Sequence, residues 1–159
     1  AFERWADWDV DLFEKIEESL LSKTRDFHYK IMGYDKSPSA VAKAKDNIKN
    51  AHLEEFISIK HEDFFKTQKA GEDKLHMVFN PPYGERLDIE MEEFYKNIGD
   101  TLKQGYPGTD AWFITSNLDA LKHVGLRPSR KIHLVNAKLE ARFVKYVMYE
   151  GSKKAKYNN

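Results

Sequence analysis

The sequence predicts an α/β fold around a mostly parallel β-sheet. Short apolar runs with strand character alternate along the chain with segments whose apolar residues recur at helical spacing. This alternation is typical of a parallel sheet covered by helices. Near the end, residues 131–135 and 142–149 are strand-like and have no helix between them, which predicts an antiparallel edge pair. The length of 159 residues fits one domain.

Four segments are predicted to be helical. The first covers residues 9–23, where Asp7 or Asp9 can cap the helix. The second begins at Ser37, a capping residue, with Pro38 in the first turn. A third helix covers residues 88–104, and Asn117 can cap a short fourth helix that ends at Val124. The apolar positions at helical spacing in the first two are Val10, Phe13, Ile16 and Leu20, and Val41, Ala44, Ile48 and Ala51.

Composition excludes several classes of protein. Lysine plus arginine equals aspartate plus glutamate at 26 each, so the chain lacks the basic excess of an autonomous nucleic-acid binder. The absence of cysteine excludes disulfides and weakly favours a cytoplasmic protein. No apolar stretch is long enough to cross a membrane, and the six scattered histidines predict no metal site. We expect one domain in residues 1–150 and a polar, basic tail in residues 151–159.

Three polar residues follow predicted strands. The strands at 29–35, 56–59 and 74–79 are followed by or end in Asp35, Asp63 and Asn80. Because ligands of open α/β sheets bind outside the carboxyl ends of the strands, these residues are candidates for one site.

Each acid also has a purely structural interpretation. Asp35 is placed to accept hydrogen bonds from a ribose diol, but it can equally be a turn or capping carboxylate. Asp63 can accept from an adenine amino group and Phe64 can cover the adenine face. Taken alone, a polar turn and a core aromatic are favoured for this pair. Adenosine recognition at these positions would indicate S-adenosylmethionine as a methyl donor.

The tetrapeptide Asn80-Pro81-Pro82-Tyr83 is the most specific motif in the chain. The Asn80 side-chain oxygen and the Pro81 carbonyl can accept both protons of an exocyclic amine, which favours the charge that develops during methyl transfer. Two prolines hold the acceptors in place, and Tyr83 can stack on a flipped base. The alternative is a rigid turn after a strand. Together with the two acids, the motif favours methylation of a nucleobase amine.

The longer stretch Asn80-Pro81-Pro82-Tyr83-Gly84-Glu85-Arg86-Leu87 resembles the catalytic motif of a known family. This family comprises the bacterial 23S ribosomal RNA guanine-N2-methyltransferases, the THUMP-associated RlmL-type RNA methylases. The flanks resemble it too, and the likeness covers nearly the whole chain. The matching flanks are residues 2–9, Gly33-Tyr34-Asp35, residues 42–47 and residues 139–154.

The resemblance implies a Rossmann-like, S-adenosylmethionine-dependent fold with a role for each candidate residue. Asp35 would contact the donor's ribose, Asp63 with Phe64 its adenine, and residues 80–83 the guanine amine of ribosomal RNA. The resemblance does not assign a role to Glu85 or Arg86.

The chain departs from the family at its start. The family's first strand and glycine-rich loop are absent, as is the RNA-binding THUMP module. By this resemblance, residues 1–150 would be a partial methyltransferase catalytic domain, the carboxy-terminal part of a longer enzyme. We therefore expect these residues alone to bind S-adenosylmethionine poorly. We also expect a gap in the middle of the sheet, which is closed by self-association through the exposed strand edges, by rearrangement, or by a further segment of the protein.

Two other functions remain open. An Asn-Pro-Pro-Tyr motif also serves DNA adenine-N6 methylation, although the extension through Leu87 favours RNA guanine. A non-catalytic domain that binds RNA or another partner is the third interpretation.

Overall fold

The computed structural model describes residues 2–82, 88–136 and 139–150. Helices and strands alternate as the sequence predicts, with an antiparallel hairpin at the end. In chain order the elements are η1 (Phe2–Arg4), α1 (Val10–Leu21), β1 (Ile31–Asp35), α2 (Pro38–Asn50), β2 (Ile57–His61), η2 (Phe64–Lys66), β3 (Leu75–Phe79), α3 (Asp88–Gly105), β4 (Thr109–Thr115), η3 (Ala120–Val124), β5 (Arg130–Asn136) and β6 (Leu139–Val147).

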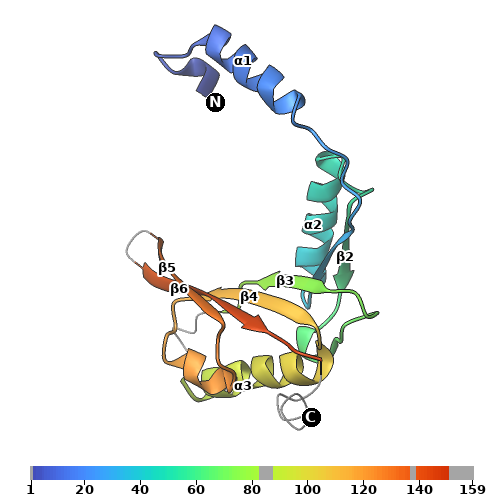
Figure 1. The fold of residues 1–159 in the computed structure, drawn as a ribbon, viewed down its shortest axis with the longest axis vertical. Coiled ribbons are helices and arrows are strands. Elements are labelled where there is room, and N and C mark those ends of the chain that lie inside the picture. The colour runs from blue at the N-terminus through green and yellow to red at the C-terminus, as the bar shows by residue number, and fades with distance from the viewer. Residues whose placement is uncertain (1, 83–87, 137–138, 151–159) are drawn as a thin grey trace, which may run out of the picture.

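The strands form two separate sheets (Figure 1). Strands β1 and β2 make a parallel pair, and the other sheet has the order β3-β4-β6-β5. Strand β3 is parallel to β4, while β6 is antiparallel to both of its neighbours. The predicted α/β class is confirmed, and so is the break between the two halves of the sheet. The self-association expected at the open edges of β1 and β3 stays a prediction.

The predicted helix caps Asp9 and Ser37 are confirmed by their hydrogen bonds. The Asp9 carboxylate accepts from the Leu12 amide at 2.9 Å, which identifies the capping aspartate of α1. Ser37 caps α2 with Pro38 in its first turn. The Asn117 side chain accepts from the Ala120 amide at 3.0 Å at the start of η3. In each case a side-chain oxygen satisfies a backbone N–H that has no partner within the helix.

The core lies between the four-stranded sheet and the layer formed by α3 and η3. The aromatic ring of Phe113 on β4 is fully buried and lies within 6.2 Å of the rings of Phe79, Tyr95 and Tyr146. Helix α3 approaches η3 closely at Gly99, where a Cβ atom would lie 1.8 Å from the Val124 carbonyl oxygen. The buried residues of this core are Met91, Tyr95, Ile98, Leu102, Tyr106, Ala111, Phe113, Ala120, Val124, Val144 and Tyr146.

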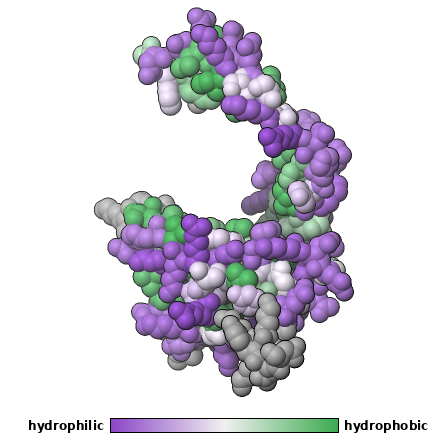
Figure 2. Space-filling view, viewed as in Figure 1, coloured by the Kyte–Doolittle hydropathy of each residue, from purple (hydrophilic) through white to green (hydrophobic). Residues whose placement is uncertain are grey.

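The first 61 residues pack far less. Helix α1 projects away from both sheets (Figure 1), and none of its residues is buried. Its apolar side chains lie at the surface, for example Leu20 at 62% exposure (Figure 2). In α2, Val41 is buried and Ala44 and Ile48 are half-buried, but Ala51 is exposed. The prediction that this helix face is buried is therefore wrong for Ala51.

The described helices include none that is both long and apolar enough to cross a lipid bilayer.

Candidate active site

Strands β1 and β2 end side by side, and this brings Asp35 next to the segment that contains Asp63. Asp35 pairs with His61 in the register, and its carbonyl oxygen accepts from the Glu62 amide at 3.0 Å. The Asp35 side chain is exposed, and its Oδ1 accepts from the Ser37 amide at 2.7 Å. This bond holds the carboxylate at the turn into α2.

Asp63 is half-buried at the start of η2. Its Oδ1 accepts from the Phe65 amide at 3.1 Å, a local cap of a short helix. The Oδ2 atoms of Asp63 and Asp35 have no hydrogen-bond partner among the described residues. The structural interpretation of each acid is therefore correct for one oxygen, and the second oxygen remains available to a ligand.

Asn80 and Pro81 lie at the end of the neighbouring sheet. Strand β3 stops at Phe79, so Asn80 is the first residue beyond it, and its side chain is exposed. Pro81 is buried and Pro82 exposed. A buried, rigid proline directly after Asn80 fixes the backbone that carries the amide. Tyr83 and the extension through Leu87 lie outside the described residues.

An aromatic contact connects the two strand ends. The ring of Phe64 lies 5.4 Å from that of Phe79, measured between centroids. Asp63 directly precedes the first ring and Asn80 directly follows the second. The fold thus brings the segments of Asp63 and Asn80 together, although no hydrogen bond or ion pair among the described residues joins Asp35 to Asn80.

Phe64 also packs inward. Its ring stacks 6.0 Å from Tyr106, and the side chain is half-buried beside the core. Burial is the largest influence on Tyr106 and raises the pKa of its hydroxyl, which also contacts Thr67 Oγ1 at 2.5 Å. A role for Phe64 in covering adenine stays a prediction.

A polar network at the end of β4 was not predicted from the sequence. Phe113 pairs with Phe79, so Thr115 and Asn117 lie at the same sheet edge as Asn80. The fully buried Thr115 places its Oγ1 2.5 Å from the Tyr95 hydroxyl and accepts from the Asn117 amide at 3.0 Å. In the sequence, the only indication of this network is a threonine at the end of a predicted buried strand. The network fixes the loop beside Asn80.

Within the part of the chain that the structure describes, no three histidine, aspartate or glutamate residues are grouped to hold a metal ion. The candidate site therefore consists of acceptor oxygens and an exposed amide at the carboxyl ends of β1, β2 and β3.

Comparison with known families agrees with this geometry. Residues 6–145 match the model of the family UPF0020, described as "RMKL-like, methyltransferase domain". The chain belongs to this family. The match begins before α1 and ends within β6, so it includes every candidate residue.

One curated relative of this chain is the ribosomal RNA large subunit methyltransferase K/L of Hahella chejuensis. It is 31% identical over 140 residues, which are 86% of this chain and 19% of that protein. The chain thus spans about a fifth of the length of this relative.

Two solved structures share the fold. A methylase candidate from Clostridium difficile 630 superposes with a TM-score of 0.76 at 25% identity, over 95% of this chain and 40% of that one. A protein from Listeria monocytogenes, described as "a predicted N6-adenine-specific DNA methylase", has a TM-score of 0.60 at 26% identity, over 74% of this chain and 30% of that one.

Proposed function

We propose that the protein uses S-adenosylmethionine to methylate the exocyclic N2 amine of a guanine in 23S ribosomal RNA. The observation that carries this proposal is the exposed Asn80 amide followed by the buried Pro81, at the strand end that Phe64 links to Asp63. Membership of a methyltransferase-domain family and the ribosomal RNA methyltransferase from Hahella chejuensis support it. Ribosomal RNA as partner and a cytoplasmic location belong to the same proposal.

The chemistry assigned to this chain is positioning and hydrogen bonding. The Asn80 side-chain oxygen and the Pro81 carbonyl accept the two protons of the amine. Acceptors that are fixed before the substrate arrives stabilise the positive charge that develops on nitrogen. No strong base is needed, because the nitrogen becomes cationic and acidic when it takes the methyl group from the sulfonium, and water can then take its proton.

The acids fit a nucleoside donor. Asp35 and Asp63 each have one carboxylate oxygen in a local cap and one without a partner among the described residues. A ribose diol and an adenine amino group are hydrogen-bond donors that match these oxygens. S-adenosylmethionine supplies the methyl group on a sulfonium, so the protein needs to align donor and acceptor.

The test is Asn80→Ala in the full-length protein, with transfer of labelled methyl groups to 23S ribosomal RNA as the readout. We expect a loss of about 100- to 1000-fold, because one fixed acceptor of the transition state is removed. Affinity for S-adenosylmethionine, measured by calorimetry, should stay nearly unchanged.

Two further variants complete this test. Asp35→Ala should weaken donor binding instead, and Asn50→Ala, at the exposed end of α2, serves as the control. Near-normal turnover of Asn80→Ala would refute the role of Asn80.

A second candidate is methylation of adenine N6 in DNA, which is favoured by the likeness to the Listeria monocytogenes protein described as a DNA methylase. The two functions are separated by offering duplex DNA and ribosomal RNA to the same enzyme. Labelled N6-methyladenine in DNA, with no label in RNA, would replace the first proposal with the second.

A further inference from the structure

The charge of the chain is strongly segregated, although its total is zero. Residues 120–147 contain seven lysines and arginines and one acid, Glu140. Residues 1–22 contain seven acids and two bases. A neutral total therefore conceals a basic segment, which is the electrostatic signature of contact with polyanions.

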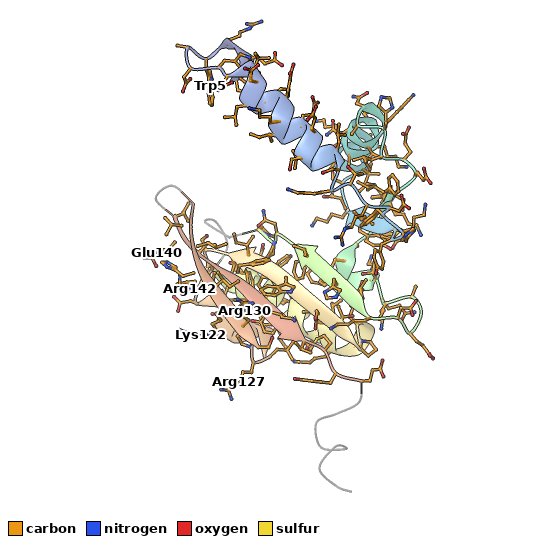
Figure 3. The ribbon with its side chains drawn as sticks, turned by 45° about the horizontal axis from the view of Figure 1, so that its top comes forward. Trp5, Lys122, Arg127, Arg130, Glu140 and Arg142 are labelled. Carbon is orange, nitrogen blue, oxygen red and sulfur yellow. The ribbon has the colours of Figure 1, made fainter. Side chains whose placement is uncertain are left out.

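In the fold this segment is one structural unit. It comprises η3, the loop that follows and strands β5 and β6, and Figure 3 shows Lys122, Arg127, Arg130 and Arg142 around this unit. Arg130 and Lys131 begin β5, which is the outermost strand of its sheet, and as consecutive strand residues they project from its two faces. We call Arg127, Arg130 and Lys131 the hairpin cations.

The acids near this surface already have partners. Asp110 is buried and pairs with Lys145 at 2.9 Å and Lys74 at 3.1 Å. Asp119 pairs with Lys122, and Glu140 lies between His133 and Arg142.

The hairpin cations, in contrast, are exposed and have no acidic partner within the described part of the chain. Their charge is uncompensated.

The surface reaches the candidate active site at one end. Arg142 on β6 pairs with Thr115 on β4 and with His133 on β5, so this row lies at the same sheet edge as Asn80. Arg130 lies three residues along β5 from His133, which is about 10 Å at the rise of an extended strand.

At the far end is an open pocket of about 310 Å³ lined by Arg127, Pro128, Ser129, Val147 and Tyr149. Tyr149 is 54% exposed, and an exposed aromatic ring beside cations suits base stacking.

We propose that η3 and the β5–β6 hairpin bind the phosphate backbone of the RNA substrate, with the hairpin cations as its unpaired anchors. The inference rests on the proposed RNA substrate and adds a binding surface to it. Cations on an edge strand also prevent sheets from pairing edge to edge. That role does not explain Arg127, which lies in a loop, or Arg142, which lies on an interior strand.

The experiment measures binding of a fluorescein-labelled 20-nucleotide single-stranded RNA by anisotropy at several salt concentrations. The variant Arg127→Glu/Arg130→Glu/Lys131→Glu keeps the edge strand charged, so protection against edge pairing is retained. Each phosphate contact contributes about 0.7 to the slope of log affinity against log salt, so the slope should fall by about 2.

The control variant is Lys43→Glu/Lys45→Glu/Lys49→Glu, three exposed lysines of α2 with no ion-pair partner among the described residues. It makes the same change in net charge and should leave the slope unaltered. An unchanged slope in the hairpin variant, or equal loss in both variants, overturns the proposal.

The alternative binding partner for this surface is the acidic segment 1–22 of a second copy of the chain. A change in sedimentation at low salt, with RNA affinity intact, would assign the surface to that partner and overturn RNA binding. Methyl transfer is measured separately. If RNA binding depends on the hairpin cations but RNA is not methylated, the proposed function is refuted. The proposal of an RNA-binding surface is then retained.

Discussion

The two halves of the molecule have equally regular backbones but very different packing. In the C-terminal unit, residues 64–148, the sheet and α3 enclose a continuous core that includes Phe113 and Tyr95. In the N-terminal unit, residues 2–61, Val41 is the single buried residue among those the structure describes. The helices and strands of the N-terminal unit are therefore regular in backbone hydrogen bonding and capping although they bury little side-chain surface. Burial needs a partner surface, and the N-terminal unit lacks one on β1 and α1.

The exposed apolar side chains show how large this difference is. Leu20 and Leu21 on α1 are 62% and 69% exposed, and Ile31 on β1 is 49% exposed. Full burial of one such side chain contributes about 1.5–3 kcal/mol. A 12-residue helix is also marginal without tertiary support. The stability of the protein should therefore reside almost entirely in the C-terminal unit.

The largest expected difference is in the free energy of unfolding, between substitution of one buried and one exposed apolar side chain. Phe113→Ala should lower the free energy of unfolding by about 3–5 kcal/mol, because it leaves a cavity among three aromatic rings. Leu20→Ala should change it by less than about 0.5 kcal/mol. Urea unfolding followed by circular dichroism measures both. Equal losses would show that α1 is packed in solution and would remove the contrast between the units.

The next effect concerns the contact between α3 and η3. In an exposed helix Gly→Ala stabilises by about 1 kcal/mol, but at Gly99 the new methyl group would overlap the Val124 carbonyl. Gly99→Ala should therefore destabilise the protein by about 1–3 kcal/mol. Thermal unfolding gives the sign directly, and a raised Tm would contradict this close packing.

A smaller effect separates two buried tyrosines of the core. The Tyr95 hydroxyl contacts Thr115, whereas the Tyr146 hydroxyl has no hydrogen-bond partner among the described residues. Burial, with a smaller contribution from Tyr95, raises the pKa of Tyr146 to about 12. Tyr95→Phe should cost about 1 kcal/mol, and Tyr146→Phe should be neutral or slightly stabilising. The reverse ranking in chemical unfolding would refute the assigned bonding.

The smallest effect is confined to acid pH. Burial alone would raise the pKa of Asp110, but the hydrogen bonds and charges of Lys145 and Lys74 outweigh it and the pKa is lowered. A lowered folded-state pKa means that the stabilisation is complete above the unfolded value and is lost as pH falls below about 4. The stability difference between the wild-type protein and Asp110→Asn should shrink in that range. A difference that is constant from pH 7 to pH 3 would show that Asp110 is not held by its lysines.

Local features were predictable because neighbouring residues determine them. Ser37 with Pro38 and Asp9 begin helices in the fold as predicted, since a cap depends on atoms three residues apart. Asn117 accepts from the Ala120 amide, but the residue at the N-cap position of η3 is Asp119. The final antiparallel pair was also predictable, because no helix separates its strands. The position of Asn80 directly after β3 agrees with the predicted strand, and its catalytic role stays a prediction.

Other features depend on contacts between distant residues and escaped prediction. A core position was favoured for Phe64, but its partners Phe79 and Tyr106, the second of which is 42 residues away, are not indicated by any local pattern. The same holds for the bond between Tyr95 and Thr115, and for the lack of a covering surface over α1.

The sequence by itself determined the elements, their caps and the chemical character of the strand ends, because periodicity and side-chain chemistry act over a few residues. Only the tertiary structure decided which strand ends meet, which aromatic rings form the core, and which basic residues of η3 and β6 have acidic partners. Those outcomes depend on strand order and burial, which are properties of the whole fold.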